Sequence, residues 1–308
     1  MTTYRLRADE PVEAAVRRIG REQVEVALGR IDGAADDVET AVHEVRKTCK
    51  KIRGLARLVR PHLGDVYREE NAWFRDTARR LSGMRDLHVM GRTLDGVCER
   101  FADECDTGRF APVRERLLER HRGGGPDAGA ALAMLGELRP ALVRARERVA
   151  CWSVPATGFA AVEPGLKLTY RRGRRAMAAV AARPTVAGVH EWRKRAKYHW
   201  YHLRLLAGCW RPVMDTWRNE ADALAETLGD AHDLAVLRSA LATDIELVQS
   251  SPDLAELLGL IDRRERELVA QALDRGGRLY AERPGRLAER LGQYWHAWRP
   301  REPLAPAT

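Results

Sequence analysis

Apolar residues recur every three or four positions along most of this chain of 308 residues, and no stretch alternates β-branched with polar residues. That spacing predicts amphipathic α-helices, because it gathers the apolar side chains on one helical face. Breaks containing proline or glycine are expected near 9–11, 60–64, 122–126, 153–158, 183–186, 210–212, 250–253, 274–277 and 282–285. The pattern therefore predicts an all-α protein with about four to five helices on each side of a join at 153–158.

Two segments of this pattern occur twice. VHEVRKTCK (42–50) returns 147 residues later as VHEWRKRAK (189–197), and LSGMRDLHVM (81–90) returns at the same offset as LGDAHDLAVL (228–237). Two motifs held at one offset indicate an internal duplication. Because the helices are long and their connections short, the predicted architecture is a pair of pseudo-symmetric antiparallel bundles of the four-helix type.

Each histidine-led segment, wound as a helix, divides into an apolar and a polar face. The apolar positions predict a buried side made of Val42, Val45, Cys49, Ile52, Ala56 and Val59 in the first copy and of Val189, Trp192, Ala196, His199, Leu203 and Leu206 in the second. The polar positions are almost all cationic: His43, Arg46, Lys47, Lys50, Arg53 and Arg57 in the first copy, and His190, Arg193, Lys194, Lys197 and Arg204 in the second. Like charges so spaced destabilise a helix, so we expect a polyanion to neutralise them.

Positive charge is concentrated in two stretches of the chain. Residues 41–61 carry a net charge of +6 and residues 165–211 a net charge of +11, although the whole chain carries only +9. Such asymmetry indicates a polyanionic partner rather than general solubility. Cations on successive helical turns lie about 5.4 Å apart, which suits a chain of phosphates. A bound phosphate is expected to raise the histidine pKa, so binding should tighten as the pH falls toward 6.

Other polar residues have a plainer interpretation. Asp86 and Asp233 each follow the leading histidine of their own copy by 43 residues, and we predict structural ion pairs for both. A role as metal ligands is the alternative, but Arg85 stands where the second copy has His232. His199 and His202 have a chelating spacing, yet His199 falls on the buried face. No metal site and no cofactor is predicted.

The remaining composition points to the cytoplasm. The longest apolar run, AMAAVAA (176–182), is far shorter than the roughly 20 residues that a membrane-spanning helix needs. The first residues show no apolar signal segment, and the five cysteines form no C-x-x-C pair. We therefore expect a cytoplasmic protein with reduced cysteines and no membrane contact.

The chain resembles the CHAD (conserved histidine α-helical domain) family. The resemblance is carried by VHEVRKTCKKIRGLARLVRP, VHEWRKRAKYHWYHLRLL, the paired RDL and HDL segments, and LTYRRGRRAM (168–177). It implies one domain over about 5–297, with halves at 5–152 and 157–297 and a flexible tail at 298–308. It also implies binding of inorganic polyphosphate in a basic groove or channel between both histidine-bearing helices, with targeting to polyphosphate granules as a further expectation.

The resemblance also assigns binding residues. The cationic faces listed above match the two family motifs, and the segment before the second motif adds Tyr170, Arg171, Arg174 and Arg175. Arg18 and Arg21, on the first helix, are the counterpart that we expect in the first half. The second motif has Tyr198, Trp200 and Tyr201 where the first has Lys51, Arg53 and Gly54, so we expect the halves to contribute unequally.

Three other functions are weighed against non-catalytic polyphosphate binding. Family members are often fused to a triphosphate-tunnel domain with an E-x-E-x-K signature, which this sequence lacks, so we do not expect an enzyme. Single-stranded nucleic acid, stacked on Trp200 and Tyr201, is the main alternative ligand. A scaffold for an acidic protein is the third, and it would not prefer chains of phosphate over single phosphates. The oligomeric state is left open.

Overall fold

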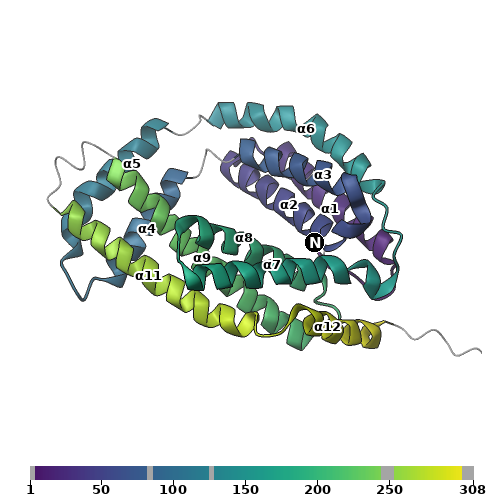
Figure 1. The fold of residues 1–308 in the computed structure, drawn as a ribbon. Helices are drawn as coiled ribbons and strands as arrows, with labels where there is room; N and C mark the ends of the chain where they lie inside the picture. The colour runs from purple at the N-terminus through teal and green to yellow at the C-terminus, as the bar shows by residue number, and fades with distance from the viewer. Residues whose placement is uncertain (1–3, 82–85, 125–127, 244–252, 300–308) are drawn as a thin grey trace, which may run out of the picture.

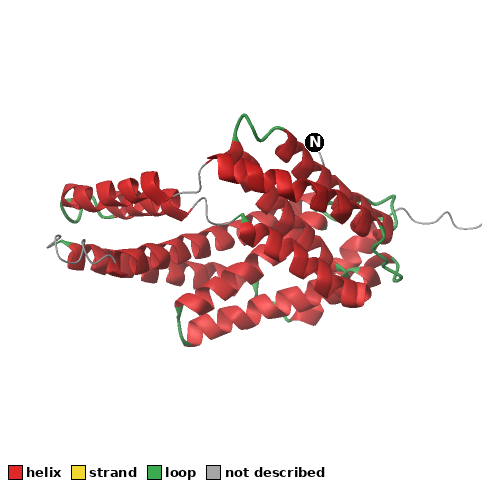
Figure 2. Cartoon of the chain, turned by 90° about the horizontal axis from the view of Figure 1, so that it is seen from above, coloured by secondary structure: helices red, strands yellow, loops and turns green. Residues whose placement is uncertain are grey.

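The computed structural model describes residues 4–81, 86–124, 128–243 and 253–299, and its described part contains helices but no strand (Figures 1 and 2). Within these described ranges, two short 3-10 helices, η1 (Thr107–Phe110) and η2 (Gly158–Ala161), accompany eleven α-helices. The α-helices are α1 (Val12–Asp32), α2 (Val38–Leu58), α3 (Arg60–Arg80), α4 (Asp86–Arg100), α5 (Ala111–Gly124), α6 (Ala128–Ala150), α7 (Glu163–Ala182), α8 (Val186–Leu205), α9 (Arg211–Thr243), α11 (Leu254–Leu279) and α12 (Pro284–Trp298). The predicted all-α class is confirmed.

Most of the expected breaks separate helices. α1 begins directly after Pro11, and the join at 153–158 lies between α6 and η2. At 60–64, α2 has just ended at Leu58, and Gly64, with φ of 51° and ψ of −124°, kinks α3. The break expected at 274–277 is wrong, because α11 continues through it to Leu279. The expected count is too low for the first half, since six described α-helices precede the join and five follow it. The predicted tail at 298–308 begins within α12, which ends at Trp298, and residues 300–308 lie outside the described residues.

The helices pack in two groups that meet along the basic helices. α1 contacts α2 and α6, and α2 contacts α3, while α8 packs between α7 and α9, and α11 lies on α9 (Figure 1). α2 contacts α7 and α8 of the other group. α4 packs on α9 and α11 although it precedes the join, and ion pairs such as Arg100–Glu267 (3.1 Å) hold it there. The two basic helices therefore lie side by side at the centre of the protein.

The apolar faces of α2 and α8 are buried as their spacing predicts. All twelve residues expected on those faces are at most 4% exposed. Trp192 and His199 belong to this set, which agrees with their assignment to the core rather than to a metal or a ligand. Burial lowers the pKa of His199 to about 4, so this imidazole is neutral near pH 7. With these faces buried, the basic faces of both helices are left for other contacts.

α8 crosses α2 at Gly54. A Cβ atom built at Gly54 would lie 2.9 Å from the Tyr201 Cβ, so only glycine allows the helices to approach this closely. The His202 Nε2 lies 3.1 Å from the Gly54 carbonyl oxygen and donates to it when this nitrogen carries the proton. Burial, with a smaller contribution from His199, lowers the pKa of His202 to about 3, which keeps the ring neutral. The crossing fixes how the two basic faces meet.

Candidate functional site

A basic pocket opens on one side of this crossing, between α2, α4, α8 and α9. It has a volume of about 560 Å³. We call it the basic pocket and define it by its lining residues: His43, Arg46, Lys47, Lys50, Lys51, Val89, Met90, Arg92, Arg193, Lys197, Trp200, Tyr201, Arg204, His232, Asp233 and Val236. Ten of these are Arg, Lys or His, and Asp233 is the one carboxylate among them. The histidine-led segments, 147 residues apart in the chain, thus meet in one strongly positive cavity.

α2 contributes a row of cations to the basic pocket. His43, Arg46, Lys47 and Lys50 lie on successive turns, and Lys51 joins them at the bottom of the row. Lys47 also pairs with Glu44 at 2.9 Å. Burial, with the nearby charges of Arg204 and Lys47, lowers the pKa of Lys51 to about 8. A lysine held beside other cations in this way gains most from an anion that enters the pocket.

α8 contributes fewer cations, arranged around an aromatic ring. The Lys197 Nζ lies 3.9 Å and the Arg204 Cζ 4.7 Å from the centre of the Trp200 ring, within the range of cation–π contacts. Lys197 also pairs with Asp222 of α9 at 2.9 Å. The Arg193 guanidinium lies against α9 at Gly229, where a Cβ atom would be 3.1 Å from its Nε. These contacts hold the three α8 cations in place before any ligand binds.

The two motif histidines are not equivalent. His43 lines the basic pocket, whereas His190 does not and packs against His232 of α9, with 4.4 Å between the ring centres. His232 itself lines the pocket. Burial lowers the pKa of both His190 and His232, and Arg193 lowers both further. Without a ligand, this pair of tilted rings, 39° apart, is therefore held in its neutral form.

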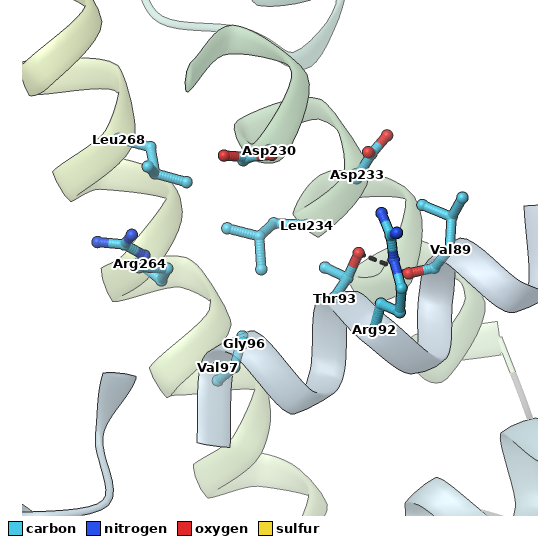
Figure 3. Close-up of a pocket in the computed structure, with 10 residues that line it drawn as sticks. All are labelled: Val89, Arg92, Thr93, Gly96, Val97, Asp230, Asp233, Leu234, Arg264 and Leu268. Atoms are coloured by element: carbon cyan, nitrogen blue, oxygen red, sulfur yellow. Dashed lines mark hydrogen bonds between the residues drawn. The ribbon is translucent and has the colours of Figure 1, made fainter. Parts of the chain in front are cut away.

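A smaller hollow of about 210 Å³ adjoins the basic pocket between α4, α9 and α11, and Figure 3 shows its lining. It shares Arg92 and Asp233 with the basic pocket. Asp230 and Arg264 complete its charged groups, which gives two carboxylates against two guanidinium groups. The hollow is thus balanced in charge, unlike the adjoining basic pocket.

Other predicted residues do not line the basic pocket. Arg53 and Arg57 lie beyond the crossing, where Arg53 donates to the Asn71 Oδ1 at 3.2 Å, and Lys194 pairs with Glu191. Tyr170 is fully buried, and its hydroxyl lies 3.1 Å from the Glu282 carbonyl oxygen, so its place is in the core rather than on a binding surface. Also outside the pocket lining are Arg171, Arg174 and Arg175 on α7 and Arg18 and Arg21 on α1. Arg18 is engaged by Glu10 and Glu22.

The predicted ion pairs of the two aspartates have different outcomes. The Asp86 side chain lies outside the described residues. Asp233 faces the basic pocket and the smaller hollow together, which places it against the basic helices as expected. Its ion pair stays a prediction.

Three cationic lining residues were missed by sequence reasoning. Lys51 directly follows Lys50 in the first motif but falls at the edge of the chosen helical face. Arg92 and His232 come from helices that the second repeated motif begins or contains. The repetition of that motif was a signal for them, but only the packing of α4 and α9 around α2 and α8 shows that they reach the same cavity.

The described residues contain neither a membrane-spanning helix nor a cluster of metal ligands. No described helix combines the length and the apolar character that crossing a membrane requires. Within the described ranges, no three His, Cys, Asp or Glu residues are grouped so that they would hold a metal ion.

Comparison with known proteins identifies the family of the chain. The model of the CHAD domain matches residues 18–242. Two proteins of Mycobacterium tuberculosis, the uncharacterized protein MT2285 of strain CDC 1551 / Oshkosh and the uncharacterized protein Rv2226 of strain ATCC 25618 / H37Rv, are each 28% identical over 274 residues. That alignment covers 84% of this chain and 51% of each relative, so the chain spans about half the length of the curated relatives it matches. Because the domain model spans both histidine-led helices and the pocket between them, the chain belongs to the CHAD domain family.

Proposed function

We propose that this protein binds inorganic polyphosphate in the basic pocket, without catalysis. The observation that carries the proposal is the convergence of ten Arg, Lys and His residues from four helices on one cavity, with a single carboxylate among its described lining residues. Each phosphate of a polyphosphate chain carries a negative charge and acceptor oxygens, so successive units match cations on successive turns. Membership of the CHAD family supports the same ligand. We further propose that the two basic helices arose when one half of the chain was duplicated. We also propose that the protein associates with polyphosphate granules.

The aromatic residues of the pocket favour bare phosphate over nucleic acid. Stacking on a base requires a free ring face. Tyr201 is only 3% exposed and packs against Gly54, while the ring of Trp200 carries Lys197 and Arg204. A base would have to displace these cations, whereas a phosphate chain would bind them where they lie. Single-stranded nucleic acid is therefore the second candidate rather than the first.

The charge of the lining favours binding over catalysis. An enzyme that cleaves polyphosphate through bound divalent cations needs carboxylates facing the chain. Asp233 is the only such group in the described lining, and Asp222 nearby is paired with Lys197. We expect long-chain polyphosphate to keep its length on a gel after incubation with the protein and Mg²⁺ or Mn²⁺. Shortening that depends on the protein would replace the proposal with an enzymatic function.

The direct test is reversal of one charge on each basic helix. We expect the double variant Arg46→Glu with Arg193→Glu to lose binding of labelled long-chain polyphosphate by at least about a hundredfold, since two contacts become repulsive. Fluorescence anisotropy measures the affinity, and circular dichroism checks that helicity is kept.

A matched control reverses the same number of charges elsewhere. Arg30 and Arg283 are exposed and lie outside the basic pocket, so Arg30→Glu with Arg283→Glu should bind within about twofold of the wild type. Equal losses in both double variants would mean that net charge alone drives binding. Normal binding by the Arg46 and Arg193 variant would show that the ligand binds elsewhere.

A further inference from the structure

A second cationic cluster lies on the other side of the α2–α8 crossing. Positions 47, 50, 54 and 57 of α2 follow one helical face, so the row of cations in the basic pocket continues past Gly54 to Arg57. There a small recess is lined by Arg57, Arg60, Leu168, Thr169, Arg172, Arg195 and Tyr198. Its four guanidinium groups come from α2, α3, α7 and α8. We call it the arginine recess.

The contact at Gly54 separates the arginine recess from the basic pocket. Tyr201 packs on Gly54 with no room for a side chain, and His202 is hydrogen-bonded to the Gly54 carbonyl oxygen. Both side chains are at most 3% exposed. A phosphate chain in the basic pocket therefore cannot pass between the helices into the recess while this contact holds. The recess is a site of its own.

The arginines of the recess have little negative charge to balance them. Arg195 pairs with Glu191, but the ion pairs of the described residues include none for Arg57, Arg60 or Arg172. Instead the Arg57 Cζ lies 3.8 Å from the centre of the Tyr198 ring, and the Arg60 Cζ lies 4.8 Å from that of Tyr67. The aromatic rings hold the guanidinium groups close together without neutralising them.

Two further observations show that the arginine cluster is electrostatically unfavourable without a bound anion. The Arg57 Nε is buried without a hydrogen-bond acceptor, which is unfavourable for a charged donor. Burial and the charges of Arg60 and Arg195 lower the pKa of Arg172, as burial and the charges of Arg53 and Arg195 lower that of Arg57. An anion in the recess would relieve both the mutual repulsion and the unmet donor.

The size of the recess limits what binds there. Its volume is about 10 Å³, enough for one oxygen atom, which has about the size of a water molecule, and too small for a whole phosphoryl group or a chain. Guanidinium groups bind the oxygens of tetrahedral oxyanions through N–H donors, and one arginine from each of four helices lines the recess. We propose that the arginine recess binds a single phosphoryl group, which inserts one oxygen between the arginines and is either free orthophosphate or the terminal group of a phosphate chain. This proposal stands apart from polyphosphate binding in the basic pocket.

The test is a calorimetric titration of the full chain with orthophosphate at constant ionic strength. We expect one phosphate per chain for the wild type, and at least about tenfold weaker binding for Arg60→Gln with Arg172→Gln, which removes two of the four charges. The control Arg171→Gln with Arg175→Gln removes two exposed charges of α7 outside the recess and should bind as the wild type does. Arg46→Glu with Arg193→Glu should also keep orthophosphate binding, although it abolishes binding in the basic pocket.

The outcomes separate this proposal from the first one. If the wild type binds no stoichiometric orthophosphate, or if only the basic-pocket variant loses it, the arginine recess is not a phosphate site. Thermal melting checks that the Arg60 and Arg172 variant is folded. Because the substitutions remove like-charge repulsion, the ligand-free variant should be at least as stable as the wild type. Short linear polyphosphates with free or esterified ends show whether the bound group is a chain terminus or free orthophosphate. If the wild type prefers free ends and the Arg60 and Arg172 variant does not, the recess binds a chain terminus. If neither protein prefers free ends, the recess binds orthophosphate.

Discussion

α2 and α8 carry the same motif and reach the same cavity, yet they build their sides of it differently. α2 presents five basic residues in a row, four of them Lys or Arg. α8 presents Arg193, Lys197 and Arg204, with Trp200 between the last two in the position that Arg53 has in α2. One side supplies charge, and the other supplies fewer charges that are held in place by an aromatic ring and by Asp222. The difference shows how two helices with similar sequence motifs can divide charge and positioning between them.

The first way to test this contrast is to neutralise each helix in turn. Replacing Arg46, Lys47, Lys50 and Lys51 by alanine should flatten the salt dependence of polyphosphate binding more than replacing Arg193, Lys197 and Arg204. By analogy with single strands, each lost phosphate contact removes about 0.7 from the log–log slope, so we expect reductions of up to about 2.8 and 2.1. Titrations between 50 and 400 mM salt measure these slopes.

The α7 arginines provide the matched control for that experiment. Replacing Arg171, Arg174 and Arg175 by alanine removes as many charges as the α8 variant does, but from outside the basic pocket. Its slope should stay near that of the wild type. A reduction as large as that of the α8 variant would mean that the ligand extends along α7, and a flat salt response of the wild type would argue against a polyphosphate site altogether.

A smaller effect is expected from the aromatic ring of α8. Trp200→Ala frees Lys197 and Arg204 from contacts that contribute on the order of 0.5–1 kcal/mol each, so polyphosphate affinity should fall, by at most about thirtyfold if both contacts help to position the cations. Trp200→Phe keeps a ring and should retain most of the affinity. Direct binding at 150 mM salt measures both variants. A loss for single-stranded DNA that far exceeds the loss for polyphosphate would instead identify Trp200 as a stacking surface for bases.

The smallest effect concerns pH and the paired rings of His190 and His232. Their pKa values are lowered in the free protein, and a bound polyanion raises them, so binding takes up protons. Affinity should therefore rise as the pH falls from 8 through 6, by less than tenfold per unit for each proton taken up. His232→Gln should flatten this rise. A wild-type affinity that does not change between pH 8 and pH 6 would remove the histidines from the binding reaction.

The one-dimensional pattern predicted those features that depend on a single helix. Helical spacing identified the apolar faces of α2 and α8, because a buried helical face has apolar residues at every third or fourth position of the sequence. It also identified Arg46, Lys50 and Arg193 as residues of a common site. These predictions needed no knowledge of how the helices pack.

Features that depend on packing between helices could not be predicted from the sequence. The crossing at Gly54 divides the cationic face of α2, so Arg57 belongs to the arginine recess and not to the basic pocket. The helical period places Tyr170 near arginines, but packing against Tyr280, with ring centres 5.2 Å apart, puts it in the core. Arg92 lines the pocket only because α4, which precedes the join at 153–158, packs on α9, which follows it.

The measurement that tests the central claim most directly is competition for the basic pocket. Labelled long-chain polyphosphate is bound at 150 mM salt and displaced by unlabelled polyphosphate, single-stranded DNA or RNA at equal phosphate concentration. Polyphosphate should displace the label at a concentration at least about tenfold lower than either nucleic acid, since its charge is denser and the ring of Trp200 is already occupied. Equal or better displacement by nucleic acid would contradict the account and make the pocket a site for bases or for polyanions in general.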